Sequence, residues 1–207
     1  MKRIYTFCVL LLWAVAAWGQ TASEIVSRMD AALTNLSKSG IAMTVETKIP
    51  ILGQVVAKTW QLQDKMKMET EMMGKAMVTY SDGVTLKVYS ADTNELAIAD
   101  LGSSSGNSTG DAELFSNILD GYDVSIQSET AGSWVIECKK SKSNKNKEAP
   151  KKMEVTIKKG TYHPLRLKTK MNGIGITMNI DRFGVSEKEV SFDEADYPGV
   201  TIIDKRK

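Results

Sequence analysis

The sequence predicts a mainly β protein with helices, an α+β fold built on one curved antiparallel sheet that forms an incomplete barrel. Three observations predict it. Apolar and polar residues alternate in about ten or eleven short runs. The turns between these runs are short, which is typical of antiparallel neighbours. Two amphipathic helical segments are available to cover one face of a sheet that is too wide to stay flat.

The N-terminal segment has the order of charged and apolar residues of a secretory signal peptide. Lys2 and Arg3 precede an apolar run from Phe7 to Ala17, and the small residue Gly19 closes the segment. The run is shorter than the roughly 20 residues that a membrane-spanning helix needs. We expect cleavage near Gly19 and Gln20, which divides the chain into a signal peptide, 1–19, and a mature protein, 20–207, outside the cytoplasm.

The mature chain is expected to form a single domain with no overall charge. Removing 19 of the 207 residues leaves 188, enough for one domain with a sizeable core. Without Lys2 and Arg3, 25 basic residues stand against 25 acidic ones, so the charge gives no signal for nucleic-acid binding. Cys8 is lost with the signal peptide. Cys138 is then the only cysteine, so no internal disulfide can form, and its apolar flank favours a small buried residue over a reactive thiol.

One amphipathic helix is predicted to open the domain, from Thr21 to Lys38. Thr21 and Glu24 have the spacing of a capping box, and Gly40 ends the helix. Its apolar residues recur with the helical period at Ile25, Met29, Ala32, Leu33 and Leu36.

After Gly40 the apolar period changes to two, and the rest of the chain reads mostly as strands in two sets. The first set covers Ile41 to Ile49, Gln54 to Gln63, Lys65 to Met72, Ala76 to Tyr80, Val84 to Ser90 and Glu95 to Leu101. The second set covers Asp123 to Glu129, Ser133 to Ser141, Lys151 to Lys159, Leu165 to Met171 and Ile174 to Asp181. Between the sets lie a Gly/Ser-rich loop, Gly102 to Gly110, and a short helical segment, Asp111 to Leu119.

The two helical segments are the predicted lid of the sheet. A sheet of so many strands curls because of its twist, and its inner apolar face must be covered or closed. The N-terminal helix and the short middle helix can cover that concave face. Such a shape encloses an apolar cavity.

The residues offer little to an enzyme mechanism, so no catalysis, metal or cofactor is expected. His163 is the only histidine, and it lies before Pro164 beside a turn, where a structural role is favoured over a general base. The string from Gly102 to Gly106 formally matches Gly-x-Ser-x-Gly, with Ser104 as the nucleophile. Ser104, however, lies in a nine-residue loop and not in a strand-to-helix turn.

Methionine is the unusual feature of the composition. Ten of the eleven methionines fall in the mature chain, and Met66, Met68, Met72, Met73 and Met77 crowd one hairpin. The first three of these share strand parity and point to one face. Ordinary core packing is one reading, because methionine fills irregular gaps. The other is a plastic apolar lining that repacks around acyl chains of varied shape.

If the sheet is curved, both readings apply to the same face, and we expect its side chains to line a lipid-binding cavity. The parity of several strands is left open by the pattern. The expected lining residues are Met43, Val45, Trp60, Leu62, Met66, Met68, Met72, Leu86, Val88, Leu96, Ile98, Phe115, Ile118, Trp134, Ile136, Val155 and Ile157.

A lysine cluster lies on the hairpin around Ser143 to Pro150, which joins the predicted strands Ser133 to Ser141 and Lys151 to Lys159. Its members are Lys139, Lys140, Lys142, Lys145, Lys147, Lys151 and Lys152, and Glu148 is the one acidic residue among them. A solvated loop is the ordinary interpretation of such a run. The alternative is a docking patch for an anionic membrane surface or an acidic partner.

One string and the order of the parts resemble a known family. Tyr80-Ser81-Asp82-Gly83-Val84-Thr85-Leu86-Lys87-Val88-Tyr89 is similar to the Asp-Gly-x-Thr-Leu-x-x-Tyr hairpin of the periplasmic outer-membrane lipoprotein carrier, LolA. The ending from Phe192 to Lys207, with Tyr197-Pro198-Gly199-Val200, is similar to that family's terminus. The resemblance spans essentially the whole mature chain.

The resemblance implies an unclosed barrel with a helical lid that shields the acyl chains of lipoproteins in the periplasm. It also implies two partners, an inner-membrane releasing complex and an outer-membrane receptor, with the carrier itself acting as a monomer. One departure concerns the lid. The family carries an Arg-Pro just before the apolar strand, an arginine associated with lid closure, and this chain has Gln63-Asp64-Lys65 there.

The sequence and the resemblance are therefore compatible with two functions from different classes. The first is a soluble carrier that binds the acyl chains of lipoproteins, or a related lipid, and delivers them toward the outer membrane. The second is an envelope signalling or scaffolding module of the same fold that recognises a protein or senses lipid, because a fold alone does not determine a task.

Overall fold

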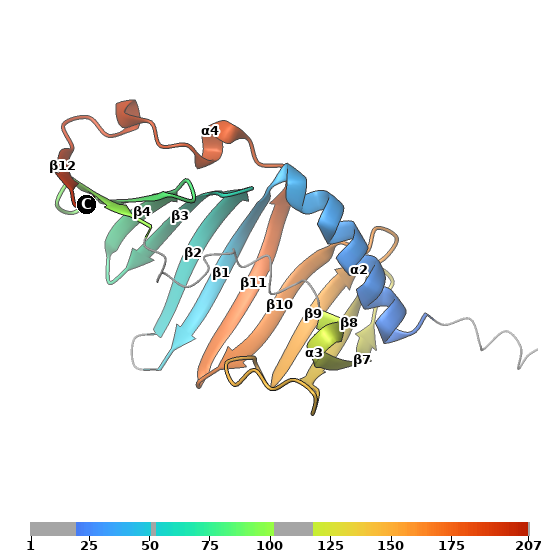
Figure 1. Ribbon diagram of the computed structural model, residues 1–207. Coiled ribbons are helices and arrows are strands. Elements are labelled where there is room, and N and C mark those ends of the chain that lie inside the picture. Colours follow the sequence, from blue (N-terminus) through green and yellow to red (C-terminus); the bar gives the residue numbers. More distant parts are fainter. Residues whose placement is uncertain (1–19, 51–52, 102–117, 207) are drawn as a thin grey trace, which may run out of the picture.

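The computed structural model describes residues 20–50, 53–101 and 118–206, and these form a twelve-stranded sheet with helices packed on it (Figure 1). The strands are β1 (Ile41–Ile49), β2 (Gly53–Leu62), β3 (Lys65–Met72), β4 (Lys75–Ser81), β5 (Thr85–Ser90), β6 (Glu95–Asp100), β7 (Tyr122–Glu129), β8 (Ser133–Lys140), β9 (Lys152–Lys158), β10 (Pro164–Met171), β11 (Ile174–Phe183) and β12 (Thr201–Asp204). The helices are α2 (Ala22–Leu36), α3 (Ile118–Gly121) and α4 (Glu187–Val190), with 3-10 turns η1 (Ser37–Ser39) and η3 (Glu194–Asp196). The predicted signal peptide and the Gly/Ser-rich loop with Ser104 lie outside the described residues.

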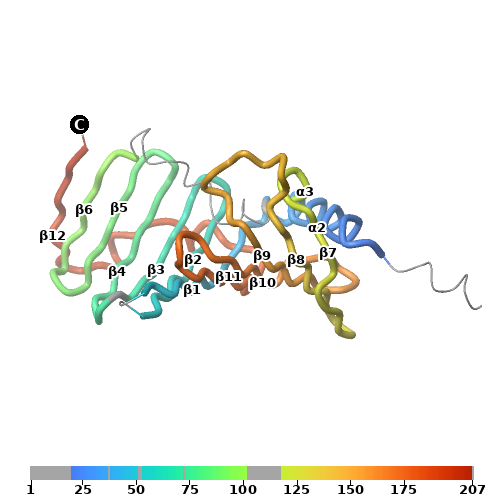
Figure 2. The backbone as a smooth tube through the Cα atoms, turned by 90° about the horizontal axis from the view of Figure 1, so that it is seen from below, coloured from blue at the N-terminus to red at the C-terminus, as the bar shows by residue number. Residues whose placement is uncertain are grey.

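The strand order is β12-β6-β5-β4-β3-β2-β1-β11-β10-β9-β8-β7. Two meanders, β1 to β6 and β7 to β11, are joined by the antiparallel pairing of β1 with β11. The strands turn progressively from one end of the sheet to the other, and the end strands β7 and β12 lie far apart (Figure 2). The sheet is therefore open and not closed into a barrel, which confirms the predicted incomplete barrel.

Helix α2 begins and ends where the sequence indicates. The Thr21 hydroxyl accepts a hydrogen bond from the Glu24 backbone N–H at 3.2 Å, and the Glu24 carboxylate accepts one from the Thr21 N–H at 2.9 Å, which is the predicted capping box. The helix ends before Gly40, whose φ is +82°. A Cβ on Gly40 would come within 2.7 Å of the Gln61 carbonyl oxygen and 2.8 Å of the Val185 side chain, so only glycine fits this turn.

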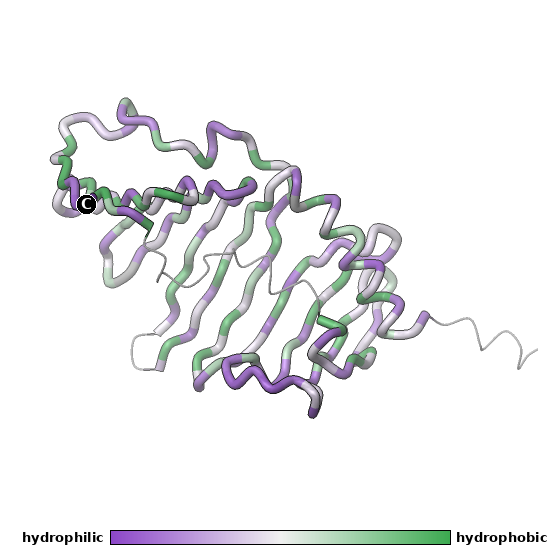
Figure 3. Tube along the Cα trace, in the orientation of Figure 1, coloured by the Kyte–Doolittle hydropathy of each residue, from purple (hydrophilic) through white to green (hydrophobic). Residues whose placement is uncertain are grey.

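The two faces of the sheet are covered by different parts of the chain. Hydrophobic and hydrophilic residues alternate along most strands (Figure 3). We call the side that carries α2 the helix face. There, Ile25, Val26, Met29 and Leu33 of α2 are buried against side chains of β1 and of β8 to β11. The predicted lid is thus confirmed for α2, and α3 is the described part of the predicted middle helix.

The C-terminal segment 184–200, which we call the strap, crosses the opposite face over β2 to β5 (Figure 1). Phe192 and Tyr197 stack on each other with their ring centroids 5.4 Å apart. Tyr197 also contacts Tyr89 at 4.5 Å, and Tyr80 meets Phe192 edge-on at 5.5 Å. The hydroxyls of Tyr80 and Tyr197 share a hydrogen bond of 2.8 Å. Aromatic packing therefore holds the strap to the sheet.

The phenol pair predicts how stability responds to alkaline pH. Burial raises the pKa of Tyr80 and of Tyr197 above the ordinary value of 10, because it disfavours the charged phenolate. A raised pKa means that the folded state holds its protons longer than the unfolded state. The stabilisation is complete below pH 10 and is lost as the pH rises above 10 toward the folded pKa values.

We therefore expect Tyr197→Phe to lower the free energy of unfolding by about 1 kcal/mol at neutral pH, through the lost hydrogen bond. It should also weaken the decline of stability above pH 10. Urea unfolding over a series of pH values measures both effects. Tyr89→Phe is the matched control, because it leaves the Tyr80–Tyr197 hydrogen bond in place, and an equal alkaline decline in both variants would contradict the assignment.

One strand was not predicted. All eleven predicted runs are strands, with boundaries shifted by up to two residues, and β12 is the twelfth. It pairs in parallel with β6, from Thr201 beside Glu95 to Asp204 beside Ile98, and all four of its residues are exposed. Because it is held by backbone pairing and not by an apolar pattern, the alternation of residues does not mark it.

Candidate functional site

Strand register determines which side chains share the helix face. From β1 to β6, one row runs through Met43, Thr59, Met68, Thr79, Val88 and Ala97. A second row runs through Ile41, Gln61, Met66, Ser81, Leu86 and Ala99. Since Ile41 and Met43 belong to the core beneath α2, both rows extend that core surface across the first meander. The helix face therefore has one part under α2 and another part beside it.

The part under α2 is tightly packed. Six of the predicted lining residues are buried there, each with at most 8% of its surface exposed: Met43, Ile118, Trp134, Ile136, Val155 and Ile157. The half-buried Val45 packs against the same cluster. In this state α2 fills the space above these residues, so they serve as core while the helix is docked.

The part beside α2 is apolar and only half-buried. We call Met66, Met68, Met77, Leu86 and Val88 the methionine surface; all five lie on the helix face, on β3, β4 and β5. Met72 shares the parity of Met68 on β3, but its side chain, like Phe115, lies outside what the structure describes. Apolar side chains that are neither sealed in the core nor fully exposed are suited to contact a ligand.

A buried hydroxyl lies in the middle of this face. Thr59 stands between Met43 and Met68 in register and exposes 4% of its surface. Within the described part of the chain its hydroxyl has no hydrogen-bond partner. An unpaired buried hydroxyl costs free energy, and a bound carbonyl or ester oxygen could accept its hydrogen bond.

Four predicted lining residues lie on the opposite face. Trp60 and Leu62 pack with Ala42, Val185 and Val190 under the strap. The buried Leu96 pairs in register with Tyr89, and Ile98 pairs with Lys87. The prediction of a common face is wrong for these four, because apolar residues lie on both sides of β2 to β6 and parity alone cannot tell which side faces the helix.

The lining residues expected from the sequence do not include one member of the methionine surface. Met77 is paired with Thr70 of β3 and Ser90 of β5, which places it on the helix face. The available signal was the two-residue turn at Met73 and Gly74, which sets the register of the hairpin once its length is known.

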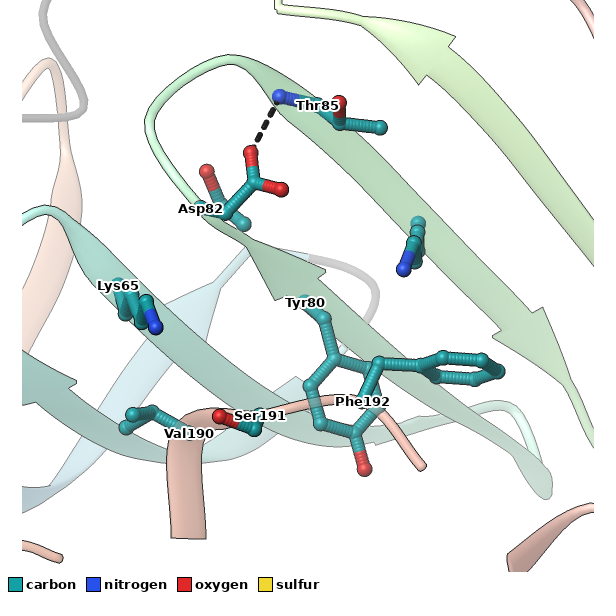
Figure 4. A pocket seen from close by; sticks show the side chains of 9 residues that line it. Lys65, Tyr80, Asp82, Thr85, Val190, Ser191 and Phe192 are labelled. Carbon is teal, nitrogen blue, oxygen red and sulfur yellow. Dashed lines mark hydrogen bonds between the residues drawn. The ribbon is translucent and has the colours of Figure 1, made fainter. Parts of the chain in front are cut away.

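The strap and the sheet together line a half-open pocket of about 150 Å³ on the opposite face (Figure 4). It is lined by Lys65, Tyr80, Ser81, Asp82, Thr85, Lys87, Val190, Ser191 and Phe192. The Asp82 carboxylate accepts hydrogen bonds from the backbone N–H groups of Thr85 and Val84, which lowers its pKa and fixes the turn. The pocket is well below the roughly 300 Å³ at which ligand pockets usually begin. An acyl chain therefore fits this pocket less well than the methionine surface.

Cys138 is buried in the core beneath the helices, with 0% of its surface exposed. Burial raises the pKa of its thiol to about 12, and the nearby Glu137 carboxylate adds to the effect. Thiolate is the reactive form, so the closed protein protects this cysteine both sterically and electrostatically. Its reactivity consequently reports on opening of the core.

Features for catalysis are sparse in the described residues. His163 packs edge-on against Phe183 with ring centroids 5.3 Å apart, and its carbonyl accepts a hydrogen bond from the Lys158 N–H in the turn before β10. No group of three His, Cys, Asp or Glu side chains is placed to hold a metal ion in the part of the chain that the structure describes. Across the same residues, no helix is long and apolar enough to cross a membrane.

An open twelve-stranded sheet, lidded by an N-terminal helix and strapped by its C-terminal segment, defines a LolA-like fold. No family model and no curated protein matches the sequence. Among solved structures, the lipoprotein LppX of Mycobacterium tuberculosis is similar with a TM-score of 0.50 and 14% identity, over 78% of this chain and 96% of that one. This likeness shows the fold that the sequence resemblance implied.

Two further structures are similar at lower TM-scores. LprF of Mycobacterium bovis has a TM-score of 0.47 and 9% identity, over 81% of this chain and 96% of that one. The LolA superfamily protein NE2245 of Nitrosomonas europaea has a TM-score of 0.33 and 11% identity, over 84% of this chain and 99% of that one.

Proposed function

We propose that this protein is a periplasmic carrier that binds the acyl chains of lipoproteins, or a related lipid, on the helix face of its sheet. The bound lipid is delivered toward the outer membrane without covalent chemistry, so the protein is not an enzyme. The observation that carries the proposal is the methionine surface. It continues the apolar core along the same sheet face, yet its side chains are half-buried and remain available to a ligand.

The side chains of this surface suit reversible binding. Unbranched methionines adapt their shape to chains of different length and saturation, which favours adequate affinity without a rigid fit. The Thr59 hydroxyl adds one buried polar group in an otherwise apolar row, as is usual in lipid and small-molecule sites. An ester-linked acyl chain offers both the hydrocarbon and the acceptor oxygen.

The lid enlarges the site when it moves. The four residues of helix α2 that are buried, Ile25, Val26, Met29 and Leu33, are all apolar, and Arg28 adds a hydrogen bond to the Tyr162 hydroxyl at 2.8 Å. A lipid chain can replace the apolar contacts with equivalent ones, whereas the exposed Arg28–Tyr162 hydrogen bond is exchanged for water when the helix lifts. We propose that α2 lifts when lipid enters and returns when lipid is handed on.

The periplasmic location and the partners complete the proposal. They rest on the signal-peptide pattern of residues 1–19 and on the resemblance to the lipoprotein carrier. An inner-membrane releasing complex would load the monomeric carrier, and an outer-membrane receptor would unload it.

Extraction of the purified protein followed by mass spectrometry tests the function directly. We expect acylated lipids or co-purifying lipoproteins in about stoichiometric amount if the helix face is the binding site. The alternative, a signalling or scaffolding module that recognises a protein, predicts an interior without lipid. Protein recovered free of lipid, and unable to take up acyl probes when they are supplied, would contradict the carrier.

A further inference from the structure

The connection between β8 and β9 concentrates positive charge on a chain whose mature part is neutral. Residues 139–152 contain seven lysines and one acidic residue, Glu148. The segment forms a continuous hydrophilic stretch at the lower end of the sheet in Figure 3. This basic loop is separate from the methionine surface, which lies on β3, β4 and β5.

Internal ion pairs neutralise only the base of the loop. Glu137 pairs with Lys139 at 2.7 Å and also with Lys152, which lies 3.6 Å from Glu154 as well. Among the described residues, no ion pair or hydrogen bond is made by the side chains of Lys142, Lys147 and Lys151. Lys140 and Lys145 donate only to the backbone carbonyls of Asn146 and Lys142, which leaves their charge in place. Five lysines thus remain electrostatically unbalanced.

The loop has a defined structure. The Ser141 N–H donates to the Gly121 carbonyl at 3.0 Å, and the Asn144 side-chain amide donates to the same oxygen at 3.3 Å, which ties the loop to α3. The Asn146 and Glu148 N–H groups donate to the side chains of Asn144 and Asn146, each at 3.0 Å. These turns hold the lysines on one rim, so the charge is presented as a patch.

The same rim carries more basic residues and an exposed apolar one. Strands β1 and β10 end here, with Lys48 and Lys170 on either side of Gly175 in register and both exposed. The β3–β4 turn lies at the same end of the sheet and presents Met73 with 85% of its surface exposed. A rim with unpaired lysines and an exposed methionine has the composition of a membrane-contacting edge.

We propose that this lysine rim docks the protein electrostatically onto an anionic lipid bilayer. The composition of the loop favours a bilayer over a protein partner. Protein interfaces are depleted in lysine and enriched in Tyr, Trp and Arg, and residues 139–152 contain none of these three. A charged bilayer needs only a cluster of like charges near its surface. The inference does not rest on lipid carriage, since a protein with an empty helix face would dock equally well.

Co-sedimentation with vesicles tests the proposal on the purified protein. We expect binding to vesicles that mix phosphatidylglycerol with phosphatidylcholine and none to vesicles of phosphatidylcholine alone. Raising the salt concentration from about 0.1 M to about 1 M should release the protein, because the Debye length falls from about 10 Å to about 3 Å. Binding that ignores lipid charge or salt would overturn the proposal.

Two matched variants separate the patch from the total charge. K142Q/K145Q/K147Q/K151Q removes four loop lysines, and each is expected to contribute about a fivefold factor, so vesicle binding should fall at least about a hundredfold. K38Q/K58Q/K188Q/K205Q removes the same charge from exposed lysines elsewhere and should bind nearly as the original does. Equal losses in both variants, or no loss in the first, would overturn docking by this rim. Docking onto a bilayer would also be overturned if the loop variant kept its binding to vesicles and lost only its binding to an acidic protein.

Discussion

Met68→Glu is expected to abolish lipid uptake while the fold persists. Met68 lies in the centre of the methionine surface, between Thr59 and Thr79 in register, and is half-buried. A carboxylate there would have to lose its water against an acyl chain, which costs several kcal/mol unless it is protonated. We expect the affinity for a fluorescent acyl probe to fall by at least about a hundredfold, since each 1.4 kcal/mol is a factor of ten.

The partial exposure of Met68 is the reason why the fold should survive. In the protein without lipid a half-buried glutamate can reach water, so the loss of stability should stay near the ordinary 1 kcal/mol of a single substitution. Met73→Glu is the matched control, because it makes the same chemical change at a turn residue that is 85% exposed. Uptake that is unchanged in Met68→Glu, or lowered equally in the control, would remove Met68 from the lining.

The hairpins were predictable because their signals are local. Most strands from β1 to β11 alternate apolar and polar residues, and glycines such as Gly74 and Gly173, both at positive φ, mark turns between them. The Thr21–Glu24 capping box and the steric limit at Gly40 are local as well. These features needed no knowledge of distant residues, and the structure has them where the pattern indicates.

The site was only partly predictable, because the face of the sheet on which a side chain lies depends on how all the strands pair. Met66 and Met68 were placed with the core by parity within one strand, and register confirms that they share a face with Met43. Trp60 and Leu96 look equally apolar, but both lie on the opposite face, where the strap packs on Trp60. That strap reaches β2 to β5 from more than 90 residues away in the sequence, and no short pattern reveals which face it covers.

Met29→Ala is expected to expose the core under α2 and to speed both thiol labelling and lipid entry. Met29 is fully buried between the helix and the sheet. Truncating a buried methionine to alanine costs about 2–5 kcal/mol, and here the loss falls on the contact between lid and sheet. If α2 opens locally without unfolding of the sheet, the open state becomes about a hundredfold more populated for each 2.8 kcal/mol.

Cys138 reports on this opening. Its thiol is sealed beneath the helices, and burial raises its pKa to about 12, so alkylation at pH 8 proceeds only through open states, in which the pKa returns toward 9. We expect the labelling rate of Met29→Ala to rise about a hundredfold over that of the original protein. The rate at which an acyl probe binds should rise in the same variant, because the same motion uncovers the face beneath the helix.

Leu96→Ala is the control that separates a moving lid from a weaker protein. Leu96 is as deeply buried as Met29 but lies on the opposite face, away from α2. Its truncation should lower the free energy of unfolding by a similar amount and leave labelling of Cys138 under native conditions nearly unchanged. If both variants label equally fast, the thiol is reached only by global unfolding, and α2 is then a fixed part of the core whose movement cannot admit lipid.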